Sequence, residues 1–258
     1  MKTVPCCCHI VILRGLRLLA LCLPLVAAAA APDYAREQRW ADEIRPTLVV
    51  GDAVTLTQPS GHKFLALYTE APKARAAVIV VHGLGVHPDW ALIGRLRSDL
   101  PDHGYTTLSV QMPVLAADAK GEEYPALFAD AAERLAAAVA FLKAKGYRRI
   151  VIASHSMGAR MSNYYLVTQP DPGVEAWIAI GISSGGFAEA GRLRLPILDL
   201  YGERDLPQVL KGADARAAVL GKLKGSAQIE VPASDHFFNG REAEMVTRVR
   251  QFLDRLTR

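Results

Sequence analysis

Three polar side chains in this sequence have the types needed for nucleophilic catalysis at a carbonyl. Ser156 follows an apolar run and precedes a helical stretch, Asp205 follows a second apolar run and a glycine turn, and His236 follows a third run. A serine hydroxyl becomes a nucleophile when a histidine accepts its proton, and a carboxylate can hold that histidine in the required tautomer. A serine nucleophile of this kind suits carboxyl esters, thioesters and amides.

The stretch 150–160 combines a strand, a tight turn and a helix around Ser156. It resembles the nucleophile elbow G-x-S-x-G of α/β-hydrolases, with Ser154 in the first glycine position. Such a turn strains the backbone of the nucleophile and lifts its hydroxyl above the sheet. It also needs small residues two positions before and after. We therefore expect Ser154 to serve packing, and His155 to occupy a position without a defined role.

The resemblance to α/β-hydrolases covers residues 50–258, and the chain order Ser, Asp, His is the order found in that superfamily. It implies a serine hydrolase that forms an acyl-enzyme, with Ser156 as the nucleophile, His236 as the base and Asp205 as the orienting acid. The stretch 87–90, His-Pro-Asp-Trp, resembles an uncharacterised group of bacterial exported α/β-hydrolase-like proteins, which implies no particular substrate.

The same resemblance implies two backbone donors for the oxyanion that develops during acyl transfer. These are the N–H groups of Leu84, in the loop after the first buried strand, and of Met157, which follows the nucleophile. Fixed donors of this kind typically contribute a factor of ~10²–10³ in rate. Gly83 is expected to keep the backbone clear of the substrate, and Trp90 and Phe237 are candidate walls of the substrate pocket.

The elements that must position these residues alternate between strands and helices. Short runs at 48–50, 54–57 and 64–68 predict an antiparallel opening. Later strands are expected at 76–81, 106–110, 149–153, 176–182, 195–201 and 227–231, and helices at 90–100, 126–145, 157–167, 208–223 and the C-terminus. This pattern predicts an α/β-hydrolase fold, with a mostly parallel sheet of about eight strands and helices on both faces. Ligands bind such sheets at the carboxyl ends of the strands.

Two loops near that edge bear on substrate access. About a dozen residues separate the strand ending near Ile182 from the one starting near Leu195, so no large lid is expected. The longer loop from Met112 to Pro125 could overhang the nucleophile.

The first 31 residues have the pattern of a secretory signal peptide: basic residues, a short apolar run and a small-residue exit. A membrane anchor is the alternative, but the apolar run 18–31 is shorter than the ~18–20 residues of a spanning helix. We expect a protein exported to the periplasm or secreted, with one domain at 32–258 and no stable membrane insertion after cleavage. All four cysteines fall in this leader: Cys6, Cys7, Cys8 and Cys22.

Charge and motif spacing argue against several other functions. Three of the 30 basic residues and none of the 26 acidic ones fall in the leader, which leaves 27 against 26 and implies no nucleic-acid surface. Gly83-Leu84-Gly85 lacks the third glycine of a dinucleotide fingerprint, because Pro88 occupies that position.

No metal or cofactor is expected, and the expected partner is a small ester-like molecule. The remaining alternative is a catalytically silent binding protein on the same fold. The oligomeric state is left open.

Overall fold

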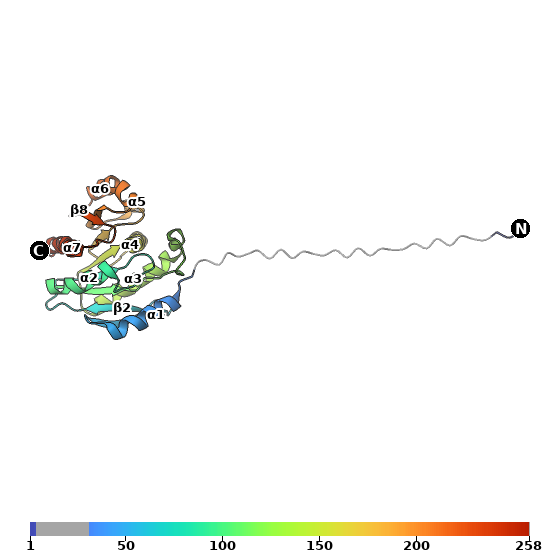
Figure 1. The fold of residues 1–258 in the computed structure, drawn as a ribbon, viewed down its shortest axis with the longest axis horizontal. Helices are drawn as coiled ribbons and strands as arrows, with labels where there is room; N and C mark the ends of the chain where they lie inside the picture. The colour runs from blue at the N-terminus through green and yellow to red at the C-terminus, as the bar shows by residue number, and fades with distance from the viewer. Residues whose placement is uncertain (4–30, 258) are drawn as a thin grey trace.

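The computed structural model describes residues 1–3 and 31–257. In this part of the chain, eight strands form one sheet in the order β1-β2-β4-β3-β5-β6-β7-β8. The labelled strands β2 and β8 lie towards opposite ends of this sheet (Figure 1). The strands are β1 (Asp52–Thr57), β2 (Lys63–Thr69), β3 (Ala76–Val81), β4 (Tyr105–Val110), β5 (Ile150–His155), β6 (Ala176–Ile180), β7 (Ile197–Arg204) and β8 (Ala227–Asp235). The pairs β1–β2 and β2–β4 are antiparallel, and all other pairs are parallel. The predicted fold class is confirmed.

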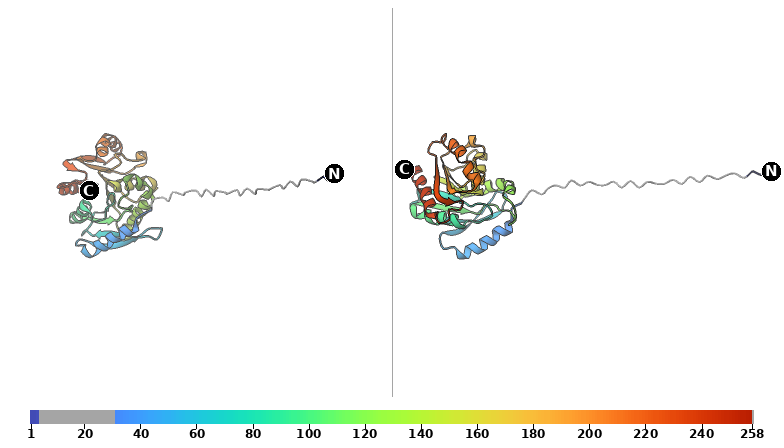
Figure 2. Two further views of the ribbon diagram at one scale, coloured as in Figure 1. Left: turned by 45° about the vertical axis from the view of Figure 1, so that its right-hand side comes forward. Right: turned by 45° about the horizontal axis from the view of Figure 1, so that its top comes forward.

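Helices cover both faces of the sheet. They are α1 (Tyr34–Ile44), α2 (Ala91–Asp99), α3 (Phe128–Ala144), α4 (Met157–Thr168), α5 (Pro207–Lys211), α6 (Ala213–Leu220) and α7 (Glu242–Leu256). Helices α3 and α4 pack on one face, and α2 and α7 on the other. Both views in Figure 2 keep α1, in blue, at the β1–β2 end and the orange helices α5 and α6 at the β8 end. Among the described residues, no helix is long and apolar enough to cross a membrane.

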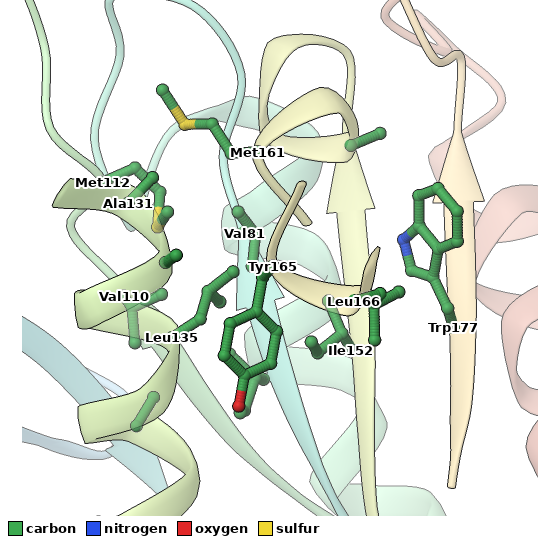
Figure 3. Close-up of a cluster of buried hydrophobic side chains, with 14 of the residues drawn as sticks. Val81, Val110, Met112, Ala131, Leu135, Ile152, Met161, Tyr165, Leu166 and Trp177 are labelled. Atoms are coloured by element: carbon green, nitrogen blue, oxygen red, sulfur yellow. The ribbon is translucent and has the colours of Figure 1, made fainter. Parts of the chain in front are cut away.

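Strand β3 lies at the centre of the sheet, and all six of its residues are buried. Successive side chains of a strand point to opposite faces. Val81 accordingly joins the core under α3 and α4, whereas Val80 joins the core under α2 and α7. Figure 3 shows Leu135 of α3 and Tyr165 of α4 directed into the first of these cores, over the central strands. A strand buried on both faces is what its continuous apolar run predicts.

Apart from shifts in the bounds of individual strands, two predicted elements differ from the structure. The expected strand at 48–50 is wrong: Pro46 lies in a 3-10 turn, and Val49 beyond it is 92 % exposed, so this run has no sheet to join. The single helix expected at 208–223 is two helices divided at Gly212. A Cβ at Gly212 would clash with the carbonyl oxygen of Gly185, so only glycine allows these two backbone segments to lie this close together.

The signal peptide predicted for 1–31 falls almost wholly on residues 4–30, outside the described residues. The segment that follows it is the helix α1, whose first turn is capped by the carboxylate of Asp33. This helix packs on β2 through Ala41 and Ile44, against Leu65 and Leu67. The helix α1 is therefore part of the folded domain.

The segment between β6 and β7 contains only a 3-10 turn at Ala190–Arg192. It therefore forms no helical lid, as its length predicts. Strands β7 and β8 run three or four residues further than expected, with an irregular register between Gly202 and Arg204. These extensions bring the ends of both strands to the carboxyl edge of the sheet.

Candidate active site

Ser156 occupies a sharp turn between β5 and α4. Its backbone dihedrals are φ 56° and ψ −116°, a region that residues other than glycine rarely adopt. The turn is fixed by the N–H of Ser156, which donates to the carbonyl of Ile180 at 2.9 Å. Gly158 allows the helix to leave the turn, because a Cβ there would lie 2.2 Å from the carbonyl oxygen of His82. These features match the strained elbow predicted from the sequence.

The three side chains predicted to act together form one hydrogen-bonded chain. His236 Nε2 lies 2.9 Å from the hydroxyl oxygen of Ser156, and His236 Nδ1 lies 2.6 Å from Oδ1 of Asp205. All three residues are buried, with between 5 and 8 % of their surface exposed. Nδ1–H donating to Asp205 leaves Nε2 free to accept the serine proton. The arrangement can therefore move a proton from Ser156 to His236.

The Asp205 carboxylate is oriented by two backbone donors. The N–H of Leu206 donates to Oδ1 at 2.7 Å, and the N–H of Gly202 donates to Oδ2 at 3.2 Å. The other two carboxylates of this region lie elsewhere. Asp199 accepts a hydrogen bond from Arg216 inside the core, and Glu203 accepts one from a backbone N–H of β8. Of the three, only Asp205 contacts His236.

Ser154 departs from the glycine of the elbow motif, and the structure supplies a reason. Its hydroxyl accepts a 2.8 Å hydrogen bond from the indole N–H of Trp177, on the neighbouring strand β6. Both residues are fully buried. A glycine at position 154 would leave that buried indole donor without a partner, so the serine satisfies a polar group that the core contains.

His155 is more closely involved than its position in the motif predicts. Its ring packs against the ring of His236, with centroids 4.7 Å apart, and its Nε2–H donates to the backbone carbonyl of His236 at 2.9 Å. Burial lowers the pKa of His155 to about 3, and the neighbouring His236 adds to this shift. A neutral His155 therefore supports the loop that carries the candidate base.

Gly181, directly after β6, was not predicted as a site residue. It has φ +53°, and a Cβ there would lie 3.0 Å from Nδ1 of His236 and 3.1 Å from Oδ2 of Asp205. Only glycine leaves room for that contact without displacing one of the two side chains. The sequence signal for this role is a glycine directly after β6, since β6 lies between the strand that leads to Ser156 and the strand that leads to Asp205.

The candidate oxyanion donors are the backbone N–H groups of Leu84 and Met157. In the described part of the chain, neither N–H donates a hydrogen bond, so both are open to a substrate oxygen. Gly83 lies against the nucleophile, since a Cβ there would be 3.3 Å from Cβ of Ser156. The role expected for Gly83, which is to keep the backbone clear of the substrate, stays a prediction.

The buried side chain of His82 and the partly buried side chain of Arg36 hold the loop that contains Leu84. His82 donates from Nδ1 to the carbonyl of Gly83 at 2.9 Å and accepts at Nε2 from the N–H of Met112 at 2.9 Å. Burial lowers the pKa of His82 to about 3, which keeps this bonding pattern in place. Arg36 of α1 donates to the carbonyl of Gly85 at 2.9 Å and to a second carbonyl in the loop after β4. No sequence pattern indicates this role for Arg36, because its partner lies 49 positions away.

Two clefts meet at Ser156. The first, of about 300 Å³, is largely apolar and includes Trp90 and Phe237, whose rings make an edge contact with centroids 5.6 Å apart. The second, of about 530 Å³, includes Arg160 and Glu122. Trp90 and Phe237, the candidate pocket walls, thus both line the apolar cleft, and Gly83 lines it as well. Across the described residues, no group of three or more His, Cys, Asp and Glu side chains could hold a metal ion.

The fold is that of α/β-hydrolases. Within that class the chain belongs to DUF3530, a family of proteins of unknown function, whose model matches residues 18–132 and 116–255. This agrees with the uncharacterised group that the sequence resembles. No curated protein matches the chain at a significant level.

Solved structures of α/β-hydrolases are similar to the chain over most of its length. XC6422 from Xanthomonas campestris, described as an α/β serine hydrolase without lid, is 18% identical with TM-score 0.61, over 81% of this chain and 95% of its own. The dienelactone hydrolase of Anabaena variabilis is 18% identical with TM-score 0.63, over 79% and 96%. The Pyrococcus furiosus esterase Pf2001 is 16% identical with TM-score 0.58, over 80% and 97%. At identities of 16–18%, this similarity shows a common fold and does not extend to activity or substrate.

Proposed function

We propose that this protein is a serine hydrolase that cleaves a carboxylic ester through an acyl-enzyme. The observation that carries the proposal is the hydrogen-bonded chain from Ser156 through His236 to Asp205, located beside two unoccupied backbone donors. Thioesters and amides are accessible to the same chemistry. Esters are favoured because the site has no lid, and because a structurally similar protein is an esterase.

In the proposed mechanism, the hydroxyl oxygen of Ser156 attacks the ester carbonyl while Nε2 of His236 accepts its proton. The carbonyl oxygen becomes an oxyanion that accepts hydrogen bonds from the N–H groups of Leu84 and Met157. Collapse of this intermediate breaks the ester C–O bond, and the departing alkoxide takes the proton from His236. Water then attacks the acyl-enzyme by the same route, releasing the acid and restoring Ser156.

A fluorophosphonate probe tests the proposal directly, because it reacts with an activated serine. The wild type should be labelled at Ser156 and should hydrolyse chromogenic esters in a series of acyl-chain lengths. Ser156→Ala should abolish labelling and reduce kcat by about 10⁶. Ser60→Ala, which removes an exposed hydroxyl from the turn between β1 and β2, serves as the matched control.

The alternative is a catalytically silent binding protein on the same fold. It predicts that folded wild-type protein shows neither labelling nor ester hydrolysis, and that result would replace the enzyme proposal. Export to the periplasm or the medium, after cleavage within the first 31 residues, is a separate proposal. Sequencing the N-terminus of protein recovered from the periplasmic fraction tests it, and an intact Met1 there would contradict it.

A further inference from the structure

The two clefts that meet at Ser156 differ in chemical character. One is lined mainly by apolar side chains, including Val86, Trp90 and Phe237. The other carries the charged and polar side chains of Arg160 and Gln208. Because both clefts include Ser156, the two sides of a scissile bond at this serine can face different surroundings.

Arg160 is the principal charge in the polar cleft. It lies one turn after the nucleophile on α4, half-buried, with its guanidinium over the ring of Phe128 at 5.4 Å. Among the described residues, no carboxylate comes within 4.0 Å of it. Burial lowers the pKa of Arg160, and the Glu122 carboxylate opposes that shift. An arginine remains cationic at neutral pH even so.

The guanidinium of Arg160 has no carboxylate partner among the described residues, so its hydrogen-bond donors are available to an anionic ligand. Other open polar groups lie in the same cleft. The Ser183 hydroxyl has no hydrogen-bond partner among the described residues, and the exposed side chain of Gln208 also lines the cleft. Glu122 is exposed at this cleft and would weakly repel an anion. Its contribution is small because exposed charges are screened by solvent.

We propose that the substrate is an ester bearing a carboxylate, which Arg160 binds in the polar cleft while an apolar group packs against Trp90 and Phe237 in the apolar cleft. This inference rests on the proposed function, since it concerns the substrate of the same serine. A planar guanidinium is suited to binding a carboxylate through two parallel hydrogen bonds. The proposal also assigns opposite roles to the two charged residues of the cleft: Arg160 favours the anionic substrate, and Glu122 opposes it.

The test compares kcat/KM for matched esters that differ by one carboxylate. In the first pair, p-nitrophenyl hemiglutarate carries the charge on the acyl side and p-nitrophenyl pentanoate lacks it. In the second pair, 4-carboxyphenyl pentanoate carries the charge on the leaving group and phenyl pentanoate lacks it. In at least one pair, the charged ester should be preferred at least tenfold by the wild type. The preferred pair identifies which side of the ester enters the polar cleft.

Substitutions of charged residues in the polar cleft test whether that cleft causes the preference for the charged ester. Arg160→Gln should lower the charged-to-neutral ratio at least tenfold, mainly through KM, and Arg160→Lys should lower it less. Glu122→Gln should raise the ratio. Arg148→Gln removes the same charge from an exposed position before β5, at the opposite edge of the sheet, and should leave the ratio unchanged. Salt should reduce the wild-type ratio.

Two results would overturn the inference. One is a ratio near one in both pairs; the other is an Arg160→Gln variant that loses charged and neutral esters equally. Fluorophosphonate labelling separates this failure from failure of the proposed function. Labelled protein without a charge preference overturns the carboxylate proposal alone, whereas folded protein that is neither labelled nor active overturns both.

Discussion

The indole N–H of Trp177 donates a 2.8 Å hydrogen bond to the hydroxyl of Ser154, two residues before the candidate nucleophile. The bond joins adjacent strands directly beneath the elbow. The position that is glycine in the motif therefore contributes one partner of a buried hydrogen bond. This bond links the side chains of β5 and β6.

Replacing Ser154 with glycine should therefore destabilise the protein, although it restores the motif. The change leaves a buried indole donor unpaired, which typically costs ~1–3 kcal/mol. Urea unfolding of Ser154→Gly measures the effect, and labelling of Ser156 should persist in the folded variant. An increase in the free energy of unfolding would contradict this account of Ser154.

Gly181→Ala should impair catalysis more than folding. The added methyl group would lie 3.0–3.1 Å from atoms of His236 and Asp205, so one of these side chains must move. We expect the rate of fluorophosphonate labelling to fall roughly tenfold or more, since small displacements of reacting groups are costly. Gly61→Ala is the control, because Gly61 also has positive φ but no atom within 4 Å of a Cβ. Equal labelling rates in the two variants would argue against a role for Gly181.

Arg36 should act as a positioning residue for the loop that carries Leu84. Arg36→Gln removes the bond to the carbonyl of Gly85, so the Leu84 N–H should lose its fixed orientation. We expect a several-fold to tenfold fall in kcat with little change in KM, because only the oxyanion contact is affected. Arg39→Gln, on the exposed side of the same helix, should leave kcat unchanged. If Arg36→Gln lowers only the midpoint temperature of thermal unfolding and leaves kcat unchanged, Arg36 has a purely structural role.

Asp205→Asn should reduce kcat by about 10⁴, because an amide cannot hold His236 in the required tautomer. It would also place an N–H₂ group against the N–H of Leu206 or of Gly202. Glu203→Gln is the control, since that carboxylate lies in the same turn but does not contact His236. Comparable loss in both variants would reassign the acid. Single-turnover acylation of a chromogenic ester is the suitable measurement.

Stability should fall below pH 6.5, in part because of His155. Its folded pKa is about 3, so between pH 3 and 6.5 the unfolded chain binds a proton that the folded chain does not. The stabilising contribution is thus complete above pH 6.5 and is lost as the pH falls towards 3, at up to about 1.4 kcal/mol per pH unit. Urea unfolding between pH 4 and 7 should show a shallower slope for His155→Gln than for the wild type. Parallel slopes would exclude this histidine as a source.

Much of the architecture could be predicted because it depends on local periodicity. Continuous apolar runs marked the parallel strands, and the loop after each strand could be assigned to one edge of the sheet without knowing the strand order. Ser156, Asp205 and His236 were therefore predicted, and the structure brings them into hydrogen-bond contact.

The features that sequence analysis missed depend on contacts between distant segments. The bond from Arg36 to Gly85 and the packing of His155 on His236 have no local pattern. The close approach of Gly212 to the backbone of Gly185, 27 positions earlier, also has no local pattern. The apolar run at 48–50 had strand propensity but no neighbouring strand to pair with, and tertiary context decided its conformation.

The strand order has a consequence for how the site can be observed. Strands β5, β6, β7 and β8 are successive neighbours, and the loops after them contribute Ser156, Gly181, Asp205 and His236 respectively. Parallel neighbours are joined by long crossovers, so this edge exists only when the whole C-terminal half of the sheet is assembled. In a mixture of folded and unfolded protein, the fraction of chains labelled at the Ser156 hydroxyl would then equal the fraction that is natively assembled. Labelling would therefore measure the folding yield.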